Sequence, residues 1–79
     1  MRPTLLRHNG FRYYFFSREE PRMHVHVSGA DGEAKFWLEP TISLATQAGL
    51  RASAVIELQT VVEENADAFR DAWREHFRG

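Results

Sequence analysis

Hydrophobic residues follow two different periodicities along the 79-residue chain. Between residues 4 and 44 apolar and polar residues alternate in short runs, whereas from Ser53 onward apolar residues recur at steps of three and four. Alternation with a period of two is typical of β-strands, and steps of three and four are typical of an amphipathic helix. The pattern therefore predicts an α+β domain, with a sheet region over residues 1–44 and a helical region over residues 52–78.

The sheet region is expected to form a small antiparallel meander of about four strands. Its clearest signal is Asn9-Gly10, because both residue types tolerate the positive φ angles of a two-residue hairpin turn. Residues 11–17 carry aromatic side chains at both parities, which predicts a central strand covered on both faces. Strands are expected at residues 4–8, 11–17, 23–28 and 33–39, turns at 9–10 and 29–32, a brief edge strand at 41–44 and a connection at 45–50.

The helical region is expected to pack its apolar side on the sheet. The apolar series runs without a break in phase, which favours one long amphipathic C-terminal helix with Ser53 as its N-cap. Asn65 and Asp67 are weak helix formers, so a bend or a split into two helices near Asn65 is the alternative. The series comprises Val55, Leu58, Val62, Ala66, Phe69, Trp73 and Phe77.

Length and composition allow a single domain over residues 1–79. A core this small rarely leaves more than about 3–5 kcal/mol of net stability, and aromatic residues, 13% of the chain, supply much of the burial. The chain contains no cysteine, which excludes a disulfide framework, a thiolate metal site and a cysteine nucleophile. No apolar run has the length of a signal segment or a membrane span, so a cytoplasmic protein without a membrane partner is expected.

Charge is distributed unevenly along the chain, although its net value is only −1. Residues 1–30 contain five arginines and two glutamates, whereas residues 31–79 contain five basic and nine acidic residues. A net charge near zero argues against strong non-specific binding to nucleic acid. The asymmetry nevertheless predicts that an anionic ligand would meet the sheet region rather than the helical region.

The sheet face opposite the helix is the main candidate for chemistry. If Met23, Val25 and Val27 pack on the helix, strand alternation directs the residues between them to the opposite face. That face combines a base, cations and aromatic rings. It is expected to carry His24, His26, Lys35 and Trp37, with either Arg12, Tyr14 and Phe16 or their alternates from the second strand.

Three interpretations of this face remain open. In the first, His24 and His26 bind a metal ion, because an H-x-H pair on a strand holds both imidazoles on one side, about 6–7 Å apart. No third ligand stands at a diagnostic spacing, so neither a metal ion nor another cofactor is expected. In the second interpretation, a partner or a second copy of the chain buries the aromatic rings, and the histidines are interface or surface groups.

In the third interpretation, the face binds or cleaves RNA. Histidine titrates near neutral pH, so His24 and His26 are the candidate general acid and base. Aromatic rings stack on unpaired bases, and cationic side chains hold phosphate groups. The candidate binding residues are Arg12 and Lys35 for phosphate and Tyr14 and Trp37 for bases.

Two segments are distinctive in sequence, HVHV at residues 24–27 and GEAKFWLEP at residues 32–40. With them, the chain resembles a widespread bacterial family of small proteins, domain-of-unknown-function family four-one-six-zero. The similarity covers essentially the whole chain, although Met23 stands where a proline or a polar residue is expected before the first histidine. Further matching segments are Pro3-Thr4, Gly10-Phe11-Arg12, Phe15-Phe16-Ser17, Pro21-Arg22, Gly49-Leu50, Ala72-Trp73 and Phe77.

The resemblance implies a toxin–antitoxin setting, because such proteins are often encoded beside another small domain that looks like an antitoxin. By this analogy the chain is the toxin component and binds a cognate, antitoxin-like small protein. The leading hypothesis adds that it acts on RNA through the face described above. The alternative is a non-enzymatic interaction module, or a homodimerisation domain, that uses the same face. Both an enzyme and a binding module are compatible with these residues.

Overall fold

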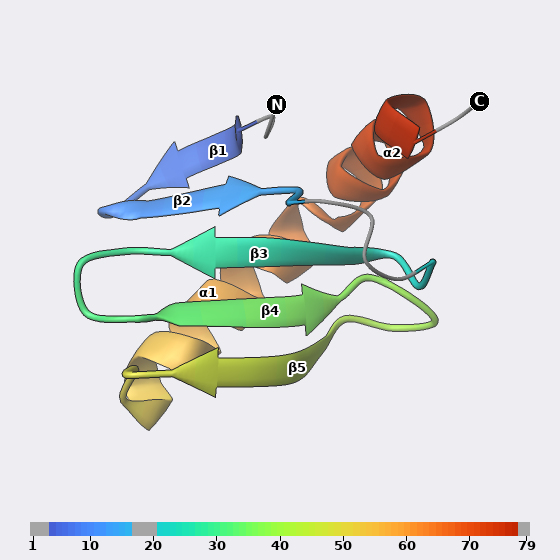
Figure 1. Cartoon of the computed structure of the whole chain (residues 1–79). Coiled ribbons are helices and arrows are strands. Elements are labelled where there is room, and N and C mark those ends of the chain that lie inside the picture. The colour runs from blue at the N-terminus through green and yellow to red at the C-terminus, as the bar shows by residue number, and fades with distance from the viewer. Residues whose placement is uncertain (1–3, 17–20, 78–79) are drawn as a thin grey trace.

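The computed structural model describes residues 4–16 and 21–77 and consists of one sheet with helices on one side (Figure 1). Its strands are β1 Thr4–His8, β2 Phe11–Tyr14, β3 His24–Ser28, β4 Glu33–Trp37 and β5 Ser43–Ala48, and its helices are α1 Ala52–Glu64 and α2 Ala66–Phe77. Neighbouring strands are antiparallel and follow one another in chain order. The α+β class and the meander predicted from the sequence are therefore confirmed.

Both predicted turns are present in the structure. Asn9 and Gly10 have φ angles of 50° and 81° and connect His8 directly to Phe11, its partner in the β1–β2 ladder. The turn at residues 29–32 is closed by a hydrogen bond of 3.0 Å, in which the Gly29 N–H donates to the Gly32 carbonyl. These turns set the register of the first four strands, and with it the face on which each side chain lies.

The second and fifth strands differ from the prediction. β2 ends at Tyr14, and Ser17 lies outside the described residues. The sheet has five strands rather than about four, because β5 continues to Ala48 where a connection was expected. β5 could not be recognised in full from the sequence because it contains a β-bulge. Phe36 pairs with Leu44 and Lys35 with Thr46, so Ala45 between them has no partner and the alternation of side chains is interrupted.

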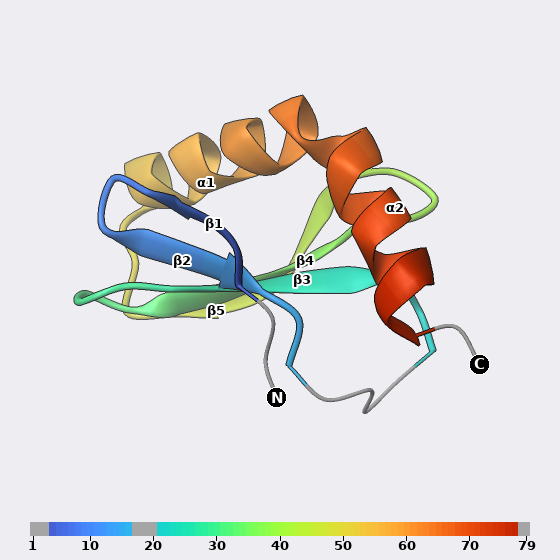
Figure 2. The ribbon, with the colours of Figure 1, turned by 90° about the horizontal axis from the view of Figure 1, so that it is seen from above.

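The helical region is divided at Asn65, the position at which the sequence allowed a split, and the prediction of one continuous helix was wrong. The Asn65 side chain donates from Nδ2 to the Val61 carbonyl, 2.8 Å away, in competition with the backbone N–H that bonds the same oxygen. The Phe69 N–H still bonds the Asn65 carbonyl at 2.9 Å. α2 therefore follows α1 at once but in a new direction (Figure 2). Residue 78 of the predicted helical region lies outside the described residues.

The start of α1 also differs from the prediction. Ser53 lies inside the first turn, and the N-cap is Arg51, whose extended backbone makes no side-chain capping bond. The preceding residue, Leu50, is buried, and its N–H donates to the Gln47 side chain at 3.1 Å. Because tertiary packing of Leu50 fixes the entry of the chain, the helix begins without the hydroxyl cap that local sequence favoured.

The core lies between the helices and one face of the sheet. Met23, Val25 and Val27, which were expected to pack on the helix, are buried, and so are Ala34, Phe36 and Leu38 in and after β4. Burial raises the pKa of Tyr13 to about 12, with the negative charge of Glu57 as a second cause. Among the residues that the structure describes, the buried apolar ones are Tyr13, Phe15, Met23, Val25, Val27, Ala34, Phe36, Leu38, Leu50, Leu58, Val62, Phe69 and Trp73.

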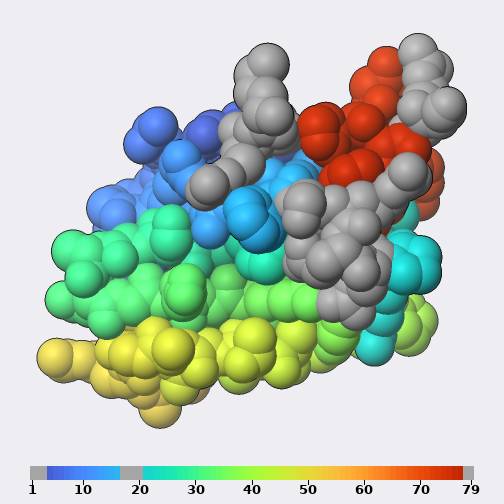
Figure 3. Space-filling view, in the orientation of Figure 1, coloured from blue at the N-terminus to red at the C-terminus, as the bar shows by residue number. Residues whose placement is uncertain are grey.

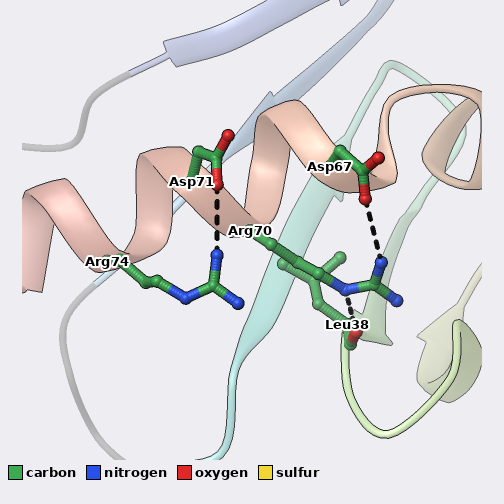
Figure 4. Close-up of polar contacts among 5 residues, drawn as sticks. All are labelled: Leu38, Asp67, Arg70, Asp71 and Arg74. Atoms are coloured by element: carbon green, nitrogen blue, oxygen red, sulfur yellow. Dashed lines mark hydrogen bonds and ion pairs between the residues drawn. The ribbon is translucent and has the colours of Figure 1, made fainter.

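The two helices cover different parts of the sheet. α1 lies across the back of the strands, whereas α2 turns around the end of the sheet at which β3 begins (Figure 2). Arg70 fastens α2 to the segment after β4, because its Nε donates to the Leu38 carbonyl at 2.8 Å (Figure 4). On the same helix, Arg74 forms a surface ion pair with Asp71, at 3.1 Å.

Candidate binding face of the sheet

The sheet face opposite the helices faces the viewer in Figure 3. By its strand register, this face carries most of the residues singled out from the sequence. The register brings Tyr14 opposite His26, and His26 opposite Lys35, so that three neighbouring strands place these side chains in one row. The sequence left two parities open for the second strand, and this register selects the even-numbered residues for the face. We define the open face as Arg12, Tyr14, Phe16, His26, Lys35 and Trp37.

On the β2–β3 half of the open face, a cation and three rings are in contact. The guanidinium carbon of Arg12 lies 4.3 Å from the centroid of the Tyr14 ring. Tyr14 stacks on His26, with ring centroids 5.6 Å apart and an interplanar angle of 23°. Phe16, 42% exposed, meets the same imidazole edge-on at 5.8 Å. β2 is thus internal, as expected, but the prediction that both its faces are covered was wrong: Tyr13 on the helix side is buried, whereas Arg12 and Tyr14 on the open face are only half-buried.

The β4 half of the open face is built around Trp37. The guanidinium carbon of Arg22 lies 4.1 Å from the Trp37 ring, and the Lys35 ammonium lies 4.7 Å from it. Arg22 is held in place by a hydrogen bond from its Nε to the Glu39 carbonyl, at 3.0 Å. An indole with two cations at its ring is a strong electrostatic contact site. Arg22 belongs to this site, although it was not among the binding residues predicted from the sequence.

His24 does not lie on the open face as the alternation predicted. Its side chain is 1% exposed, and its Nδ1 donates to the Arg22 carbonyl at 2.7 Å. Its ring lies between the Trp73 ring at 5.0 Å and the His26 ring at 5.2 Å, measured between centroids. Because His24 is the first residue of β3, α2 covers it as that helix turns around the end of the sheet. The two imidazoles are therefore adjacent, but only His26 reaches the surface.

A shallow pocket of about 400 Å³ extends from the open face towards β5. It brings Glu33 and Thr46 beside His26 and Lys35, and none of the binding predictions included Thr46. Thr46 could not be assigned from the sequence because its place depends on the bulge in β5. The pocket is lined by Tyr14, Phe16, His26, Val27, Glu33, Ala34, Lys35, Thr46, Gln47 and Ala48.

The chemistry available on this face is stacking, charge pairing and proton transfer by one imidazole. Among residues 4–16 and 21–77, no three His, Asp or Glu side chains come together as a metal site. The helices on the other side carry six acidic residues and two arginines, so they repel the anions that the open face attracts. Neither α1 nor α2, with 13 and 12 residues, has the length and apolar character needed to cross a membrane.

Comparison with known proteins gives one match. A family model described as a domain of unknown function (DUF4160) matches residues 10–74. The matched region contains the whole open face and leaves out β1 and the last residues of α2. No curated protein and no solved structure matches the chain.

Proposed function

The chain belongs to the family described as a domain of unknown function (DUF4160), and from its open face we propose that it binds single-stranded RNA. The observation that carries this proposal is the pairing of an aromatic ring with a cation on both halves of the face, Arg12 with Tyr14 and Arg22 with Trp37. Unpaired bases stack on aromatic rings and on guanidinium planes, while neighbouring cations hold the phosphates. A sheet surface with this combination suits a single strand better than a duplex.

The charges of the molecule support this orientation of the RNA. Arg12, Arg22 and Lys35 lie on or beside the open face, opposed there by Glu33 and Glu39. The helical layer is predominantly acidic. A polyanion is therefore directed to the sheet and away from the helices.

The positions of the histidines favour binding over cleavage by a histidine pair. A general acid and a general base must both come within hydrogen-bond reach of the reacting groups. His24 is enclosed by Trp73 and is bonded to the Arg22 carbonyl, whereas His26 lies at the surface. We therefore assign His26 as an RNA contact and the candidate acid or base, and His24 as a residue that positions His26 and Trp37.

Within this proposal, the chain is the toxin component of a toxin–antitoxin-type module. A cognate small protein that covers the open face would block RNA and relieve toxicity, so a single surface would serve both partners. The alternative function, a non-enzymatic interaction or homodimerisation domain, uses the same residues. Exposed Phe16 beside the pocket is the feature that supports it.

Fluorescence anisotropy with a labelled single-stranded RNA of about 12 nucleotides tests the proposal, with a duplex of the same sequence as comparison. Tyr14→Ala and Trp37→Ala are each expected to weaken binding of the single strand by about tenfold, because base stacking contributes about 1–3 kcal/mol per base. Ile56→Ala is the matched control: Ile56 is 67% exposed on α1, so the change removes an apolar surface group from the helical layer.

Absence of binding at low salt, or an equal loss in Ile56→Ala, would show that the open face does not bind RNA. A change from dimer to monomer in Trp37→Ala without any RNA binding would instead establish the homodimerisation domain. Expression of the chain alone in a bacterial host tests the toxin assignment separately. Growth inhibition that Trp37→Ala removes is the expected result, and unaffected growth would contradict that assignment.

A further inference from the structure

A second cavity lies at the hairpin end of the sheet, beyond the aromatic part of the open face. It has a volume of about 390 Å³ and is lined by Arg7, Gly10, Phe11, Arg12 and Ser28. Arg7 and Arg12 are direct partners in the β1–β2 ladder, and Arg12 in turn pairs with Ser28 of β3. Three adjacent strands therefore supply two guanidinium groups and one hydroxyl group in a single row.

The arginine pair is unfavourable for the sheet by itself. Like charges directly opposite each other on neighbouring strands repel and destabilise the pairing. In the part of the chain that the structure describes, neither Arg7 nor Arg12 forms an ion pair with a carboxylate. The repulsion is relieved if an anion lies between the two guanidinium groups, and each planar group can then bind two of its oxygen atoms.

The surroundings of the two arginines suit a tetrahedral anion. Contact with the Tyr14 ring, 4.3 Å away, orients the Arg12 guanidinium. Gly10 leaves the approach open, since even a Cβ atom at this position would meet nothing within 4 Å. On the far side, Glu33 pairs with Ser28, and its carboxylate confines an anion to the side of β1 and β2. We propose that Arg7, Arg12 and Ser28 form a phosphate-binding site.

In the proposed RNA complex, this site holds the phosphate next to the base that stacks at Tyr14. Only this identification of the phosphate as part of RNA rests on the proposed function. The site itself requires only a phosphate group, so inorganic phosphate is a sufficient probe.

Thermal unfolding in inorganic phosphate, compared with chloride at the same ionic strength, tests the site. A ligand that binds only the folded state raises the midpoint, and for a chain of this size we expect a rise of about 4 °C or more at saturating phosphate. Arg7→Gln is expected to abolish this rise, and Ser28→Ala to reduce it. Arg74→Gln removes an arginine from α2 and is expected to retain the full rise. An equal rise in Arg7→Gln, or no rise in the unaltered chain, would overturn the site.

Anisotropy with RNA separates the two proposals. Arg7→Gln is expected to weaken RNA binding and to lower the salt slope by about one, as the loss of one phosphate contact predicts. Oligonucleotides with a 5′-phosphate or a 5′-hydroxyl distinguish a terminal phosphate from an internal one. A phosphate response without RNA binding would leave the site standing and overturn the RNA function. RNA binding unaffected by Arg7→Gln, with no phosphate response, would overturn the site alone.

Discussion

The imidazole of His24 lies against the indole of Trp73, with ring centroids 5.0 Å apart, and this contact joins the start of β3 to α2. The next histidine, His26, is in contact with His24, and its ring also contacts Tyr14 of β2 and Phe16, two residues beyond the end of that strand. Two histidines that look equivalent in sequence therefore have different environments. One belongs to the packing between sheet and helix, and the other belongs to the open face.

This difference predicts unequal effects of substitution. His24→Ala leaves a cavity beside Trp73 and removes the hydrogen bond to the Arg22 carbonyl, so we expect the free energy of unfolding to fall by about 2–4 kcal/mol. His26→Ala removes a half-buried side chain and is expected to cost less than about 1 kcal/mol. Urea titrations followed by tryptophan fluorescence measure both values. Equal losses would mean that His24 has no special part in the packing of α2.

Tyr13 provides a test in which a substitution stabilises the chain. Its hydroxyl is buried and has no hydrogen-bond partner among the described residues. Tyr13→Phe keeps the ring contact with Phe69 and removes an unsatisfied polar atom, so we expect the free energy of unfolding to rise by about 1 kcal/mol. A loss of stability in urea titrations at pH 7 would show that the hydroxyl is satisfied in solution.

The same residue predicts a dependence on alkaline pH. Burial raises the pKa of Tyr13 from 10.0 to about 12, so the folded state retains the phenol proton up to a higher pH than the unfolded state does. The resulting stability is fully present below pH 10 and is lost as the pH rises towards 12. Melting curves between these values should show a steeper decline for the unaltered chain than for Tyr13→Phe. Parallel declines would contradict the raised pKa.

Arg70 and Arg74, one turn apart on α2, can be compared directly because they make different contacts (Figure 4). Arg70 bonds the Leu38 carbonyl and is 26% exposed, whereas Arg74, 62% exposed, contacts only Asp71 in that figure. Arg70→Gln is expected to cost about 1–2 kcal/mol, because a charged hydrogen bond to the sheet segment is lost. Arg74→Gln is expected to cost no more than about 0.5 kcal/mol, as is usual for an exposed ion pair. Similar costs in chemical denaturation would argue against Arg70 as a fastening point.

Gly32, in the turn between β3 and β4, lies against the backbone of Ala48 and Gly49 at the end of β5. A Cβ atom there would overlap the Ala48 carbonyl oxygen, so Gly32→Ala is expected to displace the end of β5 and cost about 1–3 kcal/mol. Gly10→Asn is the comparison, because asparagine tolerates the positive φ of Gly10 and the surrounding space is open. It should change the unfolding free energy by less than about 1 kcal/mol. Chemical denaturation of the two variants measures both free energies of unfolding. A larger loss in Gly32→Ala than in Gly10→Asn would show that Gly32 is required for steric reasons.

Local signals in the sequence were sufficient for most of the fold. The Asn9-Gly10 turn has the positive φ angles that its residue types favour, and the alternation of β3 and β4 matches their buried positions except at His24. These predictions succeeded because each depends on neighbours within a few residues of the chain. The parity of β2 was left open by the sequence, and only its ladder with β3 places the even-numbered residues beside His26 and Lys35.

The errors arose where distant parts of the chain meet. The burial of His24 depends on the path of α2, which is set by the change of direction at Asn65 and by packing of Trp73. Thr46 reaches the pocket only through the bulge in β5. Arg22 reaches Trp37 through its bond to the Glu39 carbonyl, 17 residues further along the chain. Periodicity carries no information about such contacts.

The separation of basic sheet and acidic helices gives the molecule a permanent electric dipole moment. Its isoelectric point is about 6.4, so an evenly charged protein of this composition would pass through a cation exchanger at neutral pH. With Arg12, Arg22 and Lys35 on the sheet side and six acidic residues on the helices, the molecule can rotate its sheet side towards a negatively charged resin and be retained. Its behaviour in chromatography will therefore follow the orientation of its charges rather than their total.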